Sequence, residues 1–361
     1  MIYPLNNNST VKIARNQTIV QLLRPLQAYL NRPDVTEVTI NRPGEIWVKT
    51  YHGWQSYLIP KLSFSYLQSL TTALIAFNGL PLSSISSVIL PDGQRGQIVL
   101  PPTCVEGTLS ISIRKHSMIV KSVDELWQDG AFNDYDVVHI NQSPSKPPNQ
   151  RPVEKKLTQD IGLNQLSLID QSLIKLKEAR DIRNFLEQAV LSKRNIVIAG
   201  RTGSGKTTFA RSLINKVPTQ ERVITIEDVH ELFLPHHPNR VHLLYGTGQG
   251  RVTAAECLAS CMRQSPDRIF LAELRGGEAW DYLNSLNTGH PGAITTTHAN
   301  SALQTFERMI TLIKKSNIGQ GIDIEVIRRV LYATVDIILY FENFKLKEIF
   351  YDPLFSKSKM L

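Results

Sequence analysis

The sequence has 361 residues, of which 42% are hydrophobic and 20% charged, a balance typical of a soluble globular protein with room for two domains. No apolar run approaches the roughly 18 residues that cross a bilayer, and the first residues lack the layout of a signal peptide, so we expect a cytoplasmic protein. The net charge of +8 suits nucleic acid or an anionic membrane, but no RNA-binding, zinc-finger or basic-zipper motif accompanies it.

Residues 1–135 are predicted to form a separate, mixed α+β N-terminal domain. Apolar residues at helical spacing predict helices over 18–30 and 64–77, and a short helix with a turn is expected over 123–132. Short β-rich runs separated by turn formers predict five strands, over residues 36–40, 45–49, 87–90, 95–100 and 108–114. The last strand alternates strictly and ends in Arg114.

Residues 136–162 are predicted to link this domain to a second one. The stretch 141–158, NQSPSKPPNQRPVEKKLT, has four prolines, many polar side chains and almost nothing apolar. Its length leaves open whether the first domain covers its own second domain or that of a neighbouring subunit.

Residues 163–361 are predicted to form an α/β domain. Helices and β-rich runs alternate here, which indicates a mostly parallel sheet with helices on both faces. The predicted strands cover 195–199, 222–226, 240–245, 268–272 and 293–297, with a closing antiparallel edge hairpin over 335–341 and 345–351. Ligands of such sheets bind at the carboxyl ends of the strands.

The first of these strands runs into GRTGSGKT, which fits the phosphate-loop pattern G-x-x-x-x-G-K-[ST] at every fixed position. Glycines let successive backbone N–H groups approach phosphate oxygens, and the helix that begins near Lys206 adds its positive dipole. Lys206 is expected to reach the β- and γ-phosphates of ATP, and Thr207 to ligate Mg²⁺. The predicted nucleotide-binding residues are Gly200, Arg201, Thr202, Gly203, Ser204, Gly205, Lys206, Thr207 and Thr208.

Three other strand ends carry groups that phosphoryl transfer to water requires. Glu227 and Asp228 end one strand and are candidates for the Mg²⁺ shell, and Glu273 ends another, where it would orient the attacking water. His298 ends a third. Asp267 precedes its strand and is therefore on the wrong edge of the sheet for Mg²⁺.

The three cysteines, Cys104, Cys257 and Cys261, do not form a disulfide framework. Cys257 and Cys261 lie one helical turn apart, but no His or Cys nearby in the sequence completes a metal site. We expect them to be packing residues.

Six segments together resemble the secretion traffic ATPases, the motors of type II and type IV secretion and of pilus machines. ITIEDVHEL, RIFLAELRGGEAWDYL and TGHPGAITTTHAN resemble the Asp box, Walker B and His box of that family. NRPGEIWV, LPDGQRGQIVLPP and SISIRKHS resemble the N-terminal domain of its type IV secretion and conjugation branch. The match covers roughly residues 18–345.

This resemblance implies a RecA-like ATPase domain over 163–361 and a homohexameric ring at the inner face of the bacterial inner membrane, acting with other secretion subunits. It implies that N-terminal arginines approach the phosphates, with Arg114 of the SIRK motif first and Arg95 second. His298 would couple the γ-phosphate to domain movement. Ala272 departs from the family, in which many members have Gly before the Walker B glutamate.

Three alternative functions remain open at this point. A small-molecule kinase would need a lid, and no Arg-rich lid segment follows the core. A RecA-like DNA translocase or helicase would suit the isoelectric point of about 9.3, with DNA otherwise only a possible cargo, but few aromatic residues stand on candidate DNA loops. A scaffold that only binds ATP would have no use for Glu273.

Overall fold

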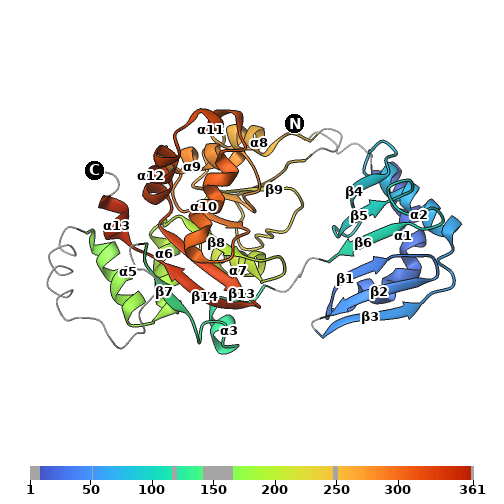
Figure 1. Ribbon diagram of the computed structural model, residues 1–361, viewed down its shortest axis with the longest axis horizontal. Coiled ribbons are helices and arrows are strands. Elements are labelled where there is room, and N and C mark those ends of the chain that lie inside the picture. Colours follow the sequence, from blue (N-terminus) through green and yellow to red (C-terminus); the bar gives the residue numbers. More distant parts are fainter. Residues whose placement is uncertain (1–8, 51, 116–119, 141–165, 247–250, 359–361) are drawn as a thin grey trace, which may run out of the picture. The chain divides into compact units, whose positions relative to one another are not determined.

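The computed structural model describes residues 9–50, 52–115, 120–140, 166–246 and 251–358. The chain divides into two compact units, one containing Met1–Met118 and Gly246–Arg251 and the other Ile119–Tyr245 and Val252–Leu361 (Figure 1). We call them the N-terminal and C-terminal units and describe each by itself.

The N-terminal unit is a six-stranded antiparallel sheet with two helices packed on one face. The sheet order is β3-β2-β1-β6-β5-β4, and every neighbouring pair is antiparallel. Its elements are α1 (Ser9–Leu30), β1 (Val35–Ile40), β2 (Glu45–Thr50), β3 (Gly53–Leu58), α2 (Phe64–Phe77), β4 (Ile85–Ile89), β5 (Arg95–Val99) and β6 (Ser110–Arg114). The expected mixed α+β domain is confirmed, and β3 is a strand that we did not predict.

The periodicity of two in β6 decides which face of this sheet is buried. Ile111 and Ile113 point into the core beneath α1 and α2, whereas Ser112 and Arg114 lie on the opposite face. The helices supply their apolar stripe to the same core, for example through Leu26 of α1.

The C-terminal unit contains a mostly parallel sheet in two hydrogen-bonded parts. One part has the order β10-β9-β11 and the other β12-β8-β13-β14-β7. The parts join where Leu274 N–H donates to Thr296 O at 2.8 Å and Thr295 Oγ1 donates to Leu271 O at 2.6 Å. The strands are β7 (Asp136–Val138), β8 (Ile196–Gly200), β9 (Val223–Glu227), β10 (Arg240–Leu244), β11 (Arg268–Leu271), β12 (Ile294–Thr297), β13 (Ile337–Glu342) and β14 (Lys345–Phe350).

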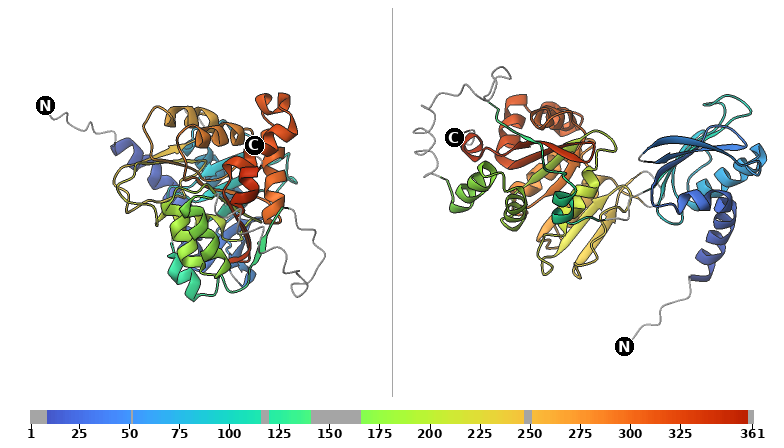
Figure 2. Two further views of the ribbon diagram at one scale, coloured as in Figure 1. Left: turned by 90° about the vertical axis from the view of Figure 1, so that its left-hand side faces the viewer. Right: turned by 90° about the horizontal axis from the view of Figure 1, so that it is seen from below.

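Helices cover both faces of this sheet, as the alternating pattern predicts (Figures 1 and 2). One buried cluster joins the sheet to α3, α5, α6 and α7, and a second joins it to α8, α9, α10 and α12. The helices are α3 (Val123–Gln128), α5 (Leu168–Glu178), α6 (Ile182–Leu191), α7 (Lys206–Ile214), α8 (Ala254–Cys261), α9 (Glu278–Asn287), α10 (Ala302–Ile313), α11 (Asn317–Gly321), α12 (Ile324–Thr334) and α13 (Pro353–Ser358). Cys257 and Cys261 of α8 are buried in the second cluster, which agrees with a packing role.

Two expectations about the order of the chain differ from the structure. The predicted boundary at residue 135 falls inside the C-terminal unit, because α3 packs on α6 and α7 and β7 pairs with β14. β13 and β14 form the predicted antiparallel hairpin, but this hairpin is not at the edge of the sheet. β13 is parallel to β8, and β7 covers the outer side of β14. The proline-rich stretch 141–158 lies outside the described residues.

Among the helices of the described part of the chain, none combines the length and the apolar character needed to cross a membrane.

The side chain of Asn195 joins the start of β8 by hydrogen bonds to the segments that precede the neighbouring strands β12 and β13. Its Oδ1 accepts from Gly292 N at 2.9 Å and from Ala293 N at 3.1 Å, and its Nδ2 donates to Thr334 O at 2.8 Å. The residue is 8% exposed, so water cannot easily replace these bonds. The phosphate-loop strand therefore depends on this side chain for its position.

Replacing Asn195 with Ala should destabilise the C-terminal unit by about 3 kcal/mol, because three buried backbone groups lose their partners. The thermal unfolding midpoint of that unit should fall by about 6–12 °C. The matched control is Asn284→Ala on the exposed side of α9, which should leave the midpoint nearly unchanged. Equal midpoints for Asn195→Ala and wild type would contradict this role.

Candidate active site

The phosphate loop takes a backbone path that its glycines make possible. Gly203 and Gly205 have φ of 77° and 94°, in the left-handed region that favours glycine. A Cβ on Gly200 would lie 2.2 Å from Phe341 O, so strand β13 also requires glycine at the first loop position. The loop then enters α7 at Lys206 with its amides at the helix N-terminus.

Lys206 is only 6% exposed although it carries an ammonium group. Its Nζ donates to Gly200 O and Arg201 O, both at 2.8 Å, and lies 3.4 Å from Nδ1 of His298. These contacts hold the positive charge at the centre of the loop, where the sequence places it.

A chain of contacts runs from Lys206 across three strand ends. His298 Nε2 lies 3.0 Å from Glu273 Oε1, and Arg275 Nη2 donates to Glu273 Oε2 at 2.7 Å. Arg275 Nη1 continues to Asp228 Oδ2 at 2.5 Å. We call Lys206, His298, Glu273, Arg275 and Asp228 the polar chain. It brings together residues from the phosphate loop, His box, Walker B and Asp box.

The polar chain keeps Glu273 ionised. Burial opposes the charge on this carboxylate, but the contacts with His298 and Arg275 outweigh burial and lower its pKa from 4.5 to about 2. Glu273 and Asp228 in turn overcome the burial of Arg275 and raise the pKa of its guanidinium. Sequence reasoning missed Arg275, although its position two residues after Glu273 in the Walker B segment was a usable signal.

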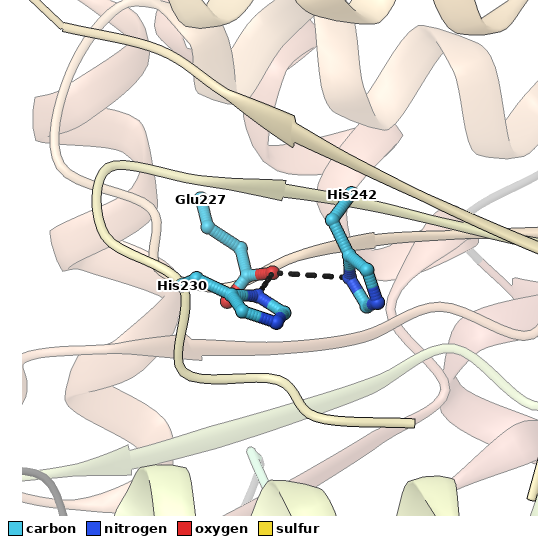
Figure 3. Close-up of side chains that lie close together, drawn as sticks. All are labelled: Glu227, His230 and His242. Carbon is cyan, nitrogen blue, oxygen red and sulfur yellow. Dashed lines mark hydrogen bonds and ion pairs between the residues drawn. The ribbon is translucent and has the colours of Figure 1, made fainter. Parts of the chain in front are cut away.

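Glu227 faces a different set of partners from the one we expected of a Mg²⁺ ligand. Its side chain is 0% exposed, and its Oε2 accepts from Glu231 N and Leu232 N at 2.6 and 2.7 Å. Its Oε1 accepts from Thr225 Oγ1 at 2.6 Å and lies beside two histidines, which Figure 3 shows. Within the described part of the chain, these contacts all belong to β9, the loop after it and β10.

The turn between β13 and β14 supports the phosphate loop, which the sequence did not predict. Asn343 and Phe344 both have positive φ, of 49° and 62°, as a two-residue hairpin turn requires. Phe344 N donates to Ser204 O at 3.1 Å, and a Cβ on Gly205 would lie 2.7 Å from the Phe344 ring. The third loop glycine is therefore also a packing requirement.

A cavity of about 480 Å³ opens beside the phosphate loop. It is lined by residues of the loop, of the segment after β12 and of α10, namely Arg201, Thr202, His298, Ala299, Asn300, Gln304 and Arg308. Arg201 and Thr202 are exposed, and Thr207 and Thr208 are half-buried at the start of α7.

The two arginines expected from the N-terminal unit are direct neighbours. Arg95 of β5 and Arg114 of β6 are paired across the two antiparallel strands, on the face that points away from the helices. Such pairs have Cβ atoms about 5 Å apart. Arg114 is exposed at the end of its strand.

Comparison with known families gives a match over residues 162–339 to the model described as "Type II/IV secretion system protein". The chain is 42% identical to the type IV secretion system protein VirB11 of Brucella suis biovar 1 (strain 1330), over 92% of this chain and 89% of that protein. It is 36% identical to protein VirB11 of Agrobacterium fabrum (strain C58), over 89% and 88% of the two chains.

Solved structures give the same result. The crystal structure of the VirB11 ATPase from the Brucella suis type IV secretion system, in complex with sulphate, is 38% identical and covers 97% of this chain and 99% of that one, with a TM-score of 0.51. The pilus retraction motor PilT with bound ADP has a TM-score of 0.51 at 17% identity, over 89% of this chain and 77% of that one, and therefore shows likeness of fold alone.

The charge on Glu273 predicts a pH dependence of stability. Because its pKa is lower in the folded protein than the usual 4.5, the ionised carboxylate stabilises the fold above about pH 4.5, and this contribution is lost as the pH falls toward about 2. The difference in unfolding free energy between wild type and Glu273→Gln should therefore shrink by on the order of 2 kcal/mol across that window.

Denaturant unfolding of both proteins at several pH values measures this difference. The control is Glu187→Gln, because its side chain is 45% exposed in a surface pair with Lys216 and should contribute little at any pH. A difference for Glu273 that stays constant from pH 5 to pH 3 would rule out the role of the polar chain in holding its charge.

Proposed function

The chain belongs to the family of type II/IV secretion system proteins and is an ATPase of its type IV branch, and from this we propose that it powers substrate transfer or pilus assembly as a homohexameric ring. The polar chain is the observation that supports this proposal most directly. It joins the phosphate-binding lysine to the water-orienting glutamate through one histidine. A motor requires such a connection, because the presence or loss of the γ-phosphate must change the conformation of other parts of the protein.

The phosphate loop fits a nucleotide triphosphate on its own geometry. Its glycines leave room for a close approach to the backbone, and the buried Oγ of Ser204 has no hydrogen-bond partner among the described residues. We propose that the loop amides and Lys206 hold the β- and γ-phosphates, and that Arg201, Thr202 and Thr208 line the same site. Lys206 would then exchange its bonds to loop carbonyls for bonds to phosphate oxygens.

Glu273 is proposed to orient the water that attacks the γ-phosphate. Its low pKa keeps it an acceptor at neutral pH, and His298 and Arg275 restrict the direction of its carboxylate. A bound Mg²⁺ supplies charge neutralisation, and Thr207 with Asp228 are the residues proposed to hold it, Asp228 through water. Glu227 is a weaker candidate because its oxygens already bind backbone and side-chain groups.

We propose that the N-terminal unit supplies Arg114 and Arg95 to the phosphates, in the same subunit or in a neighbour. His298 would respond to loss of the γ-phosphate because it contacts both Lys206 and Glu273. Release of these contacts would shift the population of domain positions and produce movement. Other secretion subunits and a peripheral position at the inner face of the inner membrane belong to this proposal, with DNA or protein as cargo.

The alternative functions gain no support. The relatives are secretion ATPases, and no comparison favours a DNA translocase. An ATP-binding scaffold would not need the contacts that keep Glu273 ionised and oriented.

Lys206→Ala should abolish ATP hydrolysis because it removes the charge at the centre of the phosphate loop. Glu273→Gln should lower kcat by about 10²–10⁴-fold, the contribution of a positioned acid–base group, while ATP binding and assembly persist. Steady-state hydrolysis with particle mass measured in the same ATP–Mg²⁺ buffer tests both.

Matched controls are Lys216→Ala, just beyond the C-terminal end of α7, and Glu187→Gln on α6, which form a surface ion pair with each other. Both should keep wild-type activity. Substantial hydrolysis by Lys206→Ala would overturn the assignment of the site, and a monomer at every nucleotide concentration would overturn the ring.

Arg114→Ala and Arg95→Ala should each lower kcat by on the order of 100-fold if these side chains stabilise charge on the phosphates. Because the two are cross-strand neighbours, the double variant should lose less than the product of the single losses. Arg42→Ala is the control, since that side chain is 66% exposed in a pair with Glu45. Unchanged kcat in both single variants would overturn the proposal that these two arginines stabilise charge on the phosphates.

A further inference from the structure

A buried carboxylate and two histidines converge at the end of β9, outside the polar chain. Nδ1 of His230 lies 3.2 Å from Oε1 of Glu227, and Nδ1 of His242 lies 3.5 Å from the same oxygen. One ligand atom from each residue lies within 4.8 Å of the others. Figure 3 shows both imidazole rings with Nδ1 directed at that oxygen.

We propose that Glu227, His230 and His242 form a binding site for a zinc ion, separate from the Mg²⁺ that accompanies the nucleotide. Two imidazole nitrogens and one carboxylate oxygen are a donor set that zinc prefers. Mg²⁺ instead requires octahedral oxygen ligands and would not select two histidines.

The separations fit tetrahedral coordination. Ligands at about 2.0–2.1 Å from zinc are about 3.3 Å from each other in a tetrahedron, and the carboxylate oxygen is 3.2 and 3.5 Å from the two nitrogens. The third separation, between one nitrogen of each histidine, is within 4.8 Å, so the two rings would move toward each other when zinc binds. Water or the Thr225 hydroxyl, 2.8 Å from Nδ1 of His242, would complete the fourth position.

The surroundings hold the three ligands in place, as metal sites require. Oε2 of Glu227 is fixed by the amides of Glu231 and Leu232. The His230 ring packs between Phe233 and His242, with centroid distances of 4.4 and 4.3 Å. The histidine side chains are 35% and 22% exposed, which gives an ion access from solvent to the buried carboxylate.

Oε1 of Glu227 accepts from the Thr225 hydroxyl and lies beside Nδ1 of both histidines. Zinc at this oxygen requires both Nδ1 atoms to act as ligands, so the proton of each neutral imidazole would stand on Nε2. An ion here would tie the loop that begins with Asp228 to strand β10 and so fix one end of the polar chain.

Zinc titration of the untagged, full-length protein tests the site. The protein is stripped with a chelator, freed of nucleotide and kept in excess Mg²⁺, and zinc affinity is measured by competition with a chromogenic chelator. We expect one zinc ion per chain. His230→Asn and His242→Asn should each weaken zinc binding by about 100-fold, because loss of a residue that only orients a ligand already costs about 10–100-fold in metal affinity. Co²⁺ in place of zinc should give the absorption of a tetrahedral N/O site.

His236→Asn is the matched control, because His236 is an exposed histidine of the same segment between β9 and β10. It should bind zinc as the wild type does, and zinc should raise the thermal unfolding midpoint of both. In the competing reading the histidines only donate hydrogen bonds to Glu227. That reading predicts no stoichiometric uptake by wild type and midpoints that zinc does not change, and either result would overturn the proposal. A cobalt absorption band from a thiolate ligand would also overturn it, because the ion would then be bound by cysteine. So would a loss of zinc affinity in His236→Asn equal to that in the other two variants.

Discussion

The buried ammonium group of Lys206 is the constraint on which the nucleotide site depends. A cation that is 6% exposed must be satisfied by oxygen or nitrogen acceptors, and the fold provides two loop carbonyls with His298 beyond them. His298 then contacts Glu273, whose second oxygen binds Arg275. These contacts are continuous, so a change at the phosphate loop alters the surroundings of the Glu273 carboxylate without any large movement between them.

The parallel register of the sheet makes this connection possible. Thr297 of β12 is paired with Ala199 of β8, so the residues that follow, His298 and Gly200, emerge at the same level. Leu271 of β11 is likewise paired with Ile226 of β9. Groups that are far apart in the sequence therefore meet along one edge.

The sequence allowed prediction of the features that depend on local spacing. The phosphate loop, the helix at Lys206 and the strands that end at Glu227 and Thr297 follow from residue patterns within a few positions. Arg275, by contrast, was not predicted, because one of its two carboxylate partners is Asp228, which is 47 positions away. The support that Phe344 gives to Ser204 likewise depends on strand pairing, and no local pattern encodes it.

The partners of Glu227 show the same limit more clearly. Its place at a strand end predicted a metal-shell carboxylate, but the adjacent strand β10 brings His242 against it. The separate pairing of β7 with β14 could not be predicted either, because a three-residue strand carries almost no periodic signal.

The pairing of β7 with β14 also determines which segment of the chain connects the two units. β7 and α5 flank the proline-rich stretch, and both belong to the C-terminal unit, so the stretch begins and ends on the same body. Its length does not set how far the N-terminal unit can travel. The two units are instead connected by the segment between Arg114 of β6 and Val123 of α3.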